Sequence, residues 1–110
     1  MNRERNRKYR RKNTMVLLNV VDSKDNRKEA RAAVVNMSPG GAAFESSIKF
    51  PRGRKVILRF TIDDKKAYVV DGVVKRVEQK TGSYIHGVKF KNLNFIEKIK
   101  LRLFIYRISR

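Results

Sequence analysis

The sequence predicts a mainly β domain that begins with a basic arm and ends in an α-helix. Short apolar runs rich in β-branched residues recur along the chain and are separated by turn residues, as in an antiparallel β-barrel or sandwich. In the last segment the apolar residues recur at helical spacing. Residues 1–13 are mostly Arg, Lys and Asn, with too little apolar surface to fold. We therefore expect a flexible arm at 1–13 and a single domain at 14–110.

Six strands account for most of the predicted domain. They are expected at 14–21, 31–36, 41–50, 55–62, 67–79 and 83–90. Clusters of turn residues separate them at 23–28, 36–41, 51–53, 63–66 and 80–82. Gly72 lies inside the fifth strand and indicates either a bulge or a close backbone approach.

Residues 93–108 predict a C-terminal helix, for which Asn94 and Glu97 have the spacing of an N-terminal cap. Apolar residues recur at helical spacing at Ile96, Ile99, Leu103 and Tyr106. Further apolar residues lie between them, so the helix is apolar on more than one stripe. We expect it to cover an open edge or mouth of the β-structure. Its second face could meet another protein or a second copy in a homodimer.

The charge of the chain predicts an anionic partner. Its 110 residues carry 28 Lys and Arg against 10 Asp and Glu, a net charge of +18. Such an excess suits a nucleotide, a nucleic acid, an acidic membrane surface or an acidic protein. The alternative is a basic surface that is merely solvated. No apolar run approaches the length of a membrane span, and we expect a cytoplasmic protein.

Little in the sequence suggests catalysis. There is no cysteine, so disulfides and thiolate metal sites are excluded. His86 is the single histidine, and it lies in an apolar strand where a structural role is expected. Asp63 and Asp64 lie in a turn that favours solvent exposure. We expect neither an enzyme nor a cofactor or metal.

Two short motifs predict the ligand site. Arg7 and Arg11 form an R-x-x-x-R pattern, and residues 36–41 form the N-x-S-x-x-G pattern Asn-Met-Ser-Pro-Gly-Gly. Arginine forks match phosphate oxygens and the O6/N7 edge of guanine, and Asn and Ser can meet the rest of a base edge. Each motif alone has a plainer explanation, a solvated tail and an ordinary type II turn. Arg3 and Arg10 offer competing registers for the arginine pair.

The two motifs together resemble the ligand signature of the PilZ domain family, the bacterial receptor module for cyclic di-GMP. The segment DGVVKRVEQKTGSYIHGVKF also resembles the late strands of that family, and the resemblance extends from about Arg7 to Arg107. It implies a six-stranded antiparallel β-barrel with a C-terminal α-helix and a flexible basic N-terminal arm. The ligand-binding residues it implies are Arg7, Arg11, Asn36, Ser38 and Gly41, with Arg10, Gly40 and Arg76 as further candidates. Asn36 stands where many members have Asp.

The resemblance implies a cyclic di-GMP receptor or adaptor whose arm clamps the ligand and whose changed surface signals to a protein partner. Two other functions stay open. One is a basic β-barrel that binds single-stranded nucleic acid, with Tyr9, Tyr68 and Tyr84 as stacking residues. The other is a PilZ-like scaffold that does not bind the ligand. Ligand stoichiometry and the output pathway are also open.

Overall fold

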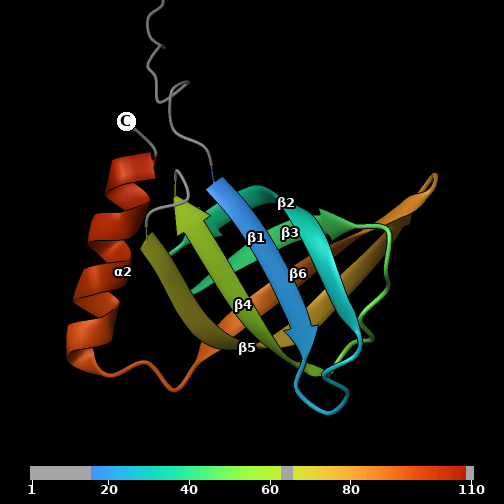
Figure 1. The fold of residues 1–110 in the computed structure, drawn as a ribbon, viewed down its shortest axis with the longest axis horizontal. Helices are drawn as coiled ribbons and strands as arrows, with labels where there is room; N and C mark the ends of the chain where they lie inside the picture. The colour runs from blue at the N-terminus through green and yellow to red at the C-terminus, as the bar shows by residue number, and fades with distance from the viewer. Residues whose placement is uncertain (1–15, 63–65, 109–110) are drawn as a thin grey trace, which may run out of the picture.

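The computed structural model describes residues 16–62 and 66–108. Six antiparallel strands there close into a barrel in the order β1-β2-β3-β6-β5-β4, and a C-terminal helix follows (Figure 1). The elements are β1 (Val16–Asp22), β2 (Glu29–Ser38), β3 (Gly41–Ser46), β4 (Lys55–Ile62), β5 (Lys66–Lys80), β6 (Ser83–Lys91) and α2 (Phe95–Ile108). The predicted fold class is confirmed, and the barrel rather than the sandwich is its architecture.

Strand β1 closes the barrel. It pairs with β2 on one side and β4 on the other, so that Leu18 lies opposite both Ala32 and Phe60. Because side chains alternate along a strand, Leu18, Val20 and Asp22 all point into the barrel. Closure leaves no unpaired strand edge at this position.

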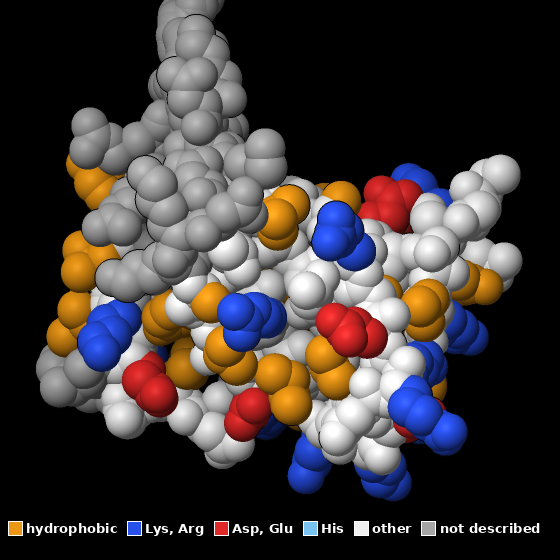
Figure 2. Space-filling view, viewed as in Figure 1, with side chains coloured by type: hydrophobic (Ala, Val, Ile, Leu, Met, Phe, Trp, Pro, Cys, Tyr) orange, Lys and Arg blue, Asp and Glu red, His pale blue; other side chains and the backbone are white. Residues whose placement is uncertain are grey.

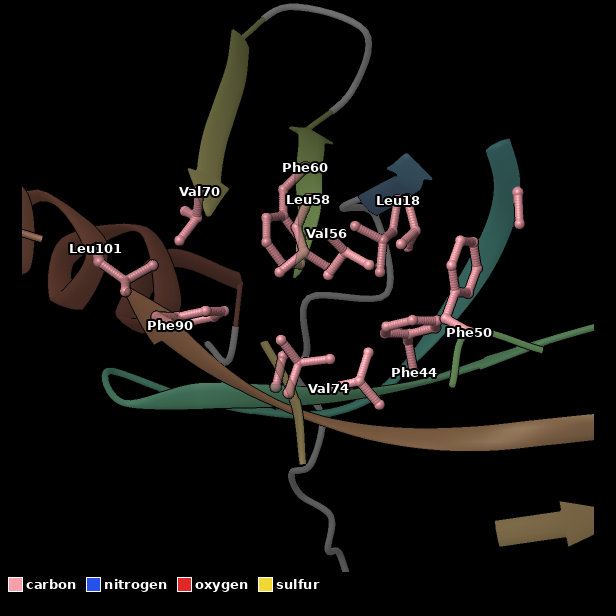
Figure 3. Close-up of a cluster of buried hydrophobic side chains, with 14 residues drawn as sticks. Leu18, Phe44, Phe50, Val56, Leu58, Phe60, Val70, Val74, Phe90 and Leu101 are labelled. Carbon is pink, nitrogen blue, oxygen red and sulfur yellow. The ribbon is translucent and has the colours of Figure 1, made fainter. Parts of the chain in front are cut away.

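The interior of the barrel is filled by inward-facing side chains, as a small barrel requires. Phe44 and Phe50 lie at one end of this core, and Phe90 meets Leu101 of α2 at the other (Figure 3). All four side chains are buried. The helix therefore contributes to the same core as the strands and packs on the barrel.

Helix α2 begins with the predicted cap. The Glu97 backbone N–H donates to Asn94 Oδ1 at 2.8 Å, and the Asn94 N–H donates to Glu97 Oε1 at 3.1 Å. These reciprocal bonds form a capping box. Tyr68 of β5 donates its hydroxyl to the backbone oxygen of Glu97 at 2.7 Å, which ties the first turn of the helix to the barrel.

The face of α2 that packs on the barrel is not the stripe singled out in the sequence. Leu101 is buried and Ile105 is partly buried against the core. Ile99, Leu103 and Tyr106 of the predicted stripe are exposed, Leu103 by 61%. Both stripes are apolar, so helical periodicity alone did not distinguish between them. No helix within the described residues is long and apolar enough to cross a membrane.

The predicted strand boundaries agree with the structure to within a few residues, and the fourth strand agrees at both ends. At Gly72 the closest neighbour is a side chain rather than another backbone segment, since a Cβ atom there would collide with the side chain of Val88. The bulge in this strand lies elsewhere, between Val74 and Arg76. The arm at 1–13 and most of the turn at 63–66 lie outside the described residues.

Candidate functional site

Two β-bulges shape the candidate site on the outer surface of the barrel. The pairing register shifts at Val35 in β2 and at Lys75 in β5. A bulge inserts one extra residue, so two consecutive side chains can emerge on the same face of the sheet. Val35 and Asn36 are accordingly both exposed, as are Lys75 and Arg76. Strict alternation would have turned Asn36 and Arg76 into the core.

One transverse row of the sheet joins Asn36 to Arg76. Asn36 lies opposite Ala43, Ala43 opposite Gly87, and Gly87 opposite Arg76. At a strand spacing of about 4.8 Å, three steps separate the two end backbones by at most about 14 Å. The small residues Ala43 and Gly87 form a floor between two long polar side chains.

Gly87 makes room for the guanidinium group of Arg76. A Cβ atom at position 87 would lie 3.0 Å from Nε and 3.2 Å from Nη2 of Arg76. The Arg76 side chain therefore crosses the outer face of β6 at Gly87 and extends toward the floor of the row. A larger residue at position 87 would push it away.

The side chain of Asn36 is oriented by the backbone of the next residue. Its Oδ1 accepts a hydrogen bond from the Met37 N–H at 2.7 Å. The carbonyl end of the amide is thus engaged, and the Nδ2 amino group is the end that can donate to a ligand.

The turn that follows Asn36 differs from the predicted type II turn. Ser38 Oγ accepts the Gly40 N–H at 3.3 Å and lies 3.4 Å from the Gly41 carbonyl oxygen, to which it donates. A type II turn needs a positive φ at its third position, but Gly40 is not among the described residues with positive φ. The Gly40 carbonyl accepts the Phe90 N–H at 2.9 Å, so the turn is also fastened to β6.

Gly41 is the last residue of the N-x-S-x-x-G motif, and the resemblance implied a ligand-binding role for it. Its φ is not positive, and a Cβ atom would fall well under 3.0 Å from the carbonyl oxygen of Val88. The structure thus gives Gly41 a packing role between β3 and β6.

These residues line an open depression of about 820 Å³ on the barrel surface. Its cationic side chains are Lys49, Arg52, Lys75, Arg76 and Lys89, and its described lining contains no acidic residue. Clustered cations attract an anion more strongly than scattered ones because their potentials add. On the face of β1 and β4 the cations are not clustered in this way, because acidic and basic side chains are interspersed there with apolar ones (Figure 2).

All the described candidates from the sequence reach this one depression: Asn36, Ser38, Gly40, Gly41 and Arg76. Arg7, Arg10 and Arg11 lie outside the described residues. Lys49, Arg52, Lys75 and Lys89 were not predicted. Alternation in the sixth strand could have placed Lys89 outward beside the buried Val88 and Phe90. No sequence signal placed Lys49 and Arg52, which lie between strands.

Other chemistry is sparse in the part of the chain that the structure describes. No group of three or more His, Asp or Glu side chains there could hold a metal ion. Among the described residues that line the depression, none is an aromatic side chain on which a base could stack. Tyr68 and Tyr84 are both partly buried, and the Tyr68 hydroxyl is engaged with α2.

The structure thus combines a closed six-stranded barrel with a cationic depression on its outer surface. The chain belongs to the PilZ domain family, whose family model matches residues 5–107. Membership supports a cyclic di-GMP-binding domain in general, because the family is one of ligand-binding receptor domains and not a known enzyme family. A search of curated proteins finds no match.

Proposed function

We propose that this chain is a cyclic di-GMP receptor that holds its ligand in the depression between Asn36 and Arg76. The observation that carries the proposal is the transverse row of Asn36, Ala43, Gly87 and Arg76 inside a lining whose described residues include five cations and no acid. A ligand with two phosphate charges and guanine edges matches that combination. No cofactor is needed beyond the ligand.

The contacts follow from the chemistry of each side chain. Arg76 can donate two parallel hydrogen bonds to guanine O6 and N7 or to a phosphate. The free Nδ2 group of Asn36 suits a guanine acceptor, and Ser38 can add one hydroxyl. Lys75 and Lys89 supply positive charge for phosphate oxygens. Each charge-assisted bond is worth about 1.5–3 kcal/mol before ordering costs.

The N-terminal arm completes the proposed receptor. Arg7 and Arg11 would close over the bound nucleotide and contact guanine and phosphate. Ordering the arm costs about 1–2 kcal/mol for each residue fixed, so affinity reflects how many arm residues become fixed. The closed arm would present a changed surface to a protein partner in the cytoplasm.

Isothermal titration calorimetry of cyclic di-GMP at near-physiological salt tests the proposal. Wild type should bind saturably, whereas Arg7→Ala and Arg11→Ala should both lose binding. Arg3→Ala is the matched control, because it removes the same charge from the arm and tests the competing register. GMP and single-stranded DNA are the ligand controls.

The calorimetry also separates the rival functions. Binding shared with DNA and abolished by salt would favour the nucleic-acid binder, whose affinity falls steeply with salt. Absence of binding in the folded protein would favour the scaffold.

A further inference from the structure

The loop between β3 and β4, residues 47–54, reaches the depression although it belongs to neither motif. Lys49, Pro51 and Arg52 all contribute to its lining. Lys49 and Arg52 are exposed, whereas Phe50 between them is buried. The loop thus inserts one apolar side chain into the barrel and presents cations on either side of it to the depression.

Phe50 is held in place by His86. The Phe50 backbone N–H donates to His86 Nε2 at 3.0 Å inside the core. The imidazole stacks on Phe44 with ring centroids 4.6 Å apart, and Phe50 meets both rings edge-on. Lys28 Nζ lies 5.0 Å from the centre of the Phe50 ring. Figure 3 shows Phe44 and Phe50 together at this end of the core.

The far end of the loop is fastened to the bulge of β5. The Gly53 N–H donates to the Val74 carbonyl at 2.8 Å, and the Val74 N–H donates to the Arg54 carbonyl at 2.9 Å. Val74 directly precedes the bulge that exposes Lys75 and Arg76. Backbone hydrogen bonds therefore fix the position of the loop cations relative to the cations at the bulge.

We propose that the β3–β4 loop is a second ligand-binding element, in which Lys49 and Arg52 contact the ligand's phosphates, and that His86 is the residue that positions it. This inference rests on the proposed function for the identity of the ligand. His86 itself is fully buried and does not touch the depression. It acts through the Phe50 amide, which fixes the path of the loop.

His86 accepts this bond only in the neutral tautomer that carries its proton on Nδ1 and none on Nε2. Burial lowers the pKa of His86, the backbone of Phe44 opposes that shift, and the positive charge of Lys28 adds to it. Among the described residues, the Tyr84 ring also lies near the imidazole, with 6.4 Å between the ring centroids. The buried surroundings of His86 thus favour the neutral imidazole, which the hydrogen bond from the Phe50 amide requires.

A double-mutant cycle tests both parts of the inference. Lys49→Ala with Arg52→Ala should weaken calorimetric binding of cyclic di-GMP by tenfold or more, about what losing one charge-assisted bond costs. His86→Phe keeps an aromatic ring but removes the acceptor, and should weaken binding several-fold. In the background that lacks Lys49 and Arg52, His86→Phe should have no further effect. Additive losses would overturn the positioning role.

Control variants separate positioning from stability. Val20→Ala creates a cavity in β1 outside the depression and should lower stability without lowering affinity. His86→Gln, whose amide oxygen can accept, should restore affinity relative to His86→Phe. His86→Asn, which is shorter, is the second variant if His86→Phe does not fold. In His86→Phe and His86→Asn, hydrogen exchange should accelerate more at the Phe50 amide than at the core amides of β1, whereas Val20→Ala should accelerate both alike through global unfolding. Unchanged exchange at the Phe50 amide in the His86 variants would contradict the positioning role of His86.

Inorganic pyrophosphate is the second probe, so that failure of the proposed function can be recognised. If cyclic di-GMP does not bind wild type but pyrophosphate shifts the amide signals of Lys49 and Arg52, the loop is an anion site and the nucleotide assignment is wrong. If neither probe moves these signals, the loop is not a ligand-binding element.

Discussion

Gly41 of β3 and Val88 of β6 approach so closely that no side chain fits between them. A Cβ atom on Gly41 would fall well under 3.0 Å from the Val88 carbonyl oxygen. The two strands pair directly here, with Gly41 opposite Lys89 and Ala42 opposite Val88. The last glycine of the N-x-S-x-x-G motif is therefore required by the barrel, whether or not a ligand is present.

Gly41→Ala should accordingly destabilise the fold. The added methyl group must displace backbone, and we expect a loss of about 1–3 kcal/mol in the free energy of unfolding. Gly40→Ala is the matched control, because nothing lies within 4 Å of its Cβ position, and it should change stability by no more than about 0.5 kcal/mol. Urea unfolding of both variants measures the difference. Equal stabilities would refute the packing role.

Arg76→Ala should weaken cyclic di-GMP binding by tenfold or more, since it removes a side chain worth about 1.5–3 kcal/mol in a charge-assisted bond. Its stability should be nearly unchanged because Arg76 is exposed. Arg59→Ala removes the same charge from an exposed position on β4 outside the depression and serves as the control. Equal losses of affinity by calorimetry would show that only net charge matters.

Asp22 should make the protein sensitive to acid. Burial tends to raise the pKa of its carboxyl, but hydrogen bonds from the Lys24 backbone, the Arg54 side chain and the Asp25 backbone, with the Arg54 charge, hold it below its ordinary value of 3.8. Because the folded pKa is lowered, the stabilisation is complete above the unfolded pKa and is lost as pH falls through the folded pKa.

Asp22→Asn should therefore be less stable at neutral pH, by about 1–3 kcal/mol for the lost charge-assisted contacts. It should also lose less of its remaining stability than wild type when the pH drops below 4. Thermal unfolding across pH measures both effects. Asp71→Asn removes an exposed carboxylate from β5, is the charge-matched control at neutral pH, and should cost little stability there. Parallel curves for wild type and Asp22→Asn would contradict this assignment.

The capping box of α2 should contribute to stability. Asn94→Ala removes the Oδ1 acceptor of the Glu97 N–H and should cost about 1 kcal/mol, whereas Asn94→Ser keeps a capping oxygen and should cost much less. Chemical denaturation of the two variants compares them. A cost for Ser as large as that for Ala would show that the cap is not what stabilises the first turn.

The strands were predictable because alternation and turn chemistry are local. The run at 55–62 alternates in part, and Gly, Pro and Asn mark the ends of several runs. The depression was only partly predictable. Asn36 and Ser38 came from a motif, but the bulges that expose Lys75 and Arg76 depend on pairing with neighbouring strands, which the sequence of one strand does not contain.

Helix α2 and the β3–β4 loop show the same limit. Two apolar stripes compete on the helix, and only packing on the barrel selects Leu101 over Leu103. Lys49 and Arg52 reach the depression because Phe50 is inserted into a core that forms from distant strands. Such tertiary causes leave no local pattern.

The most direct test of the account is a nuclear magnetic resonance titration of ¹⁵N-labelled protein with cyclic di-GMP at near-physiological salt. We predict saturable shifts of the backbone amides along the transverse row, at Asn36, Ala43, Gly87 and Arg76, with little change in β1. Shifts that cluster on another surface, or no saturable shifts in a folded protein, would contradict the claim that this depression binds the nucleotide.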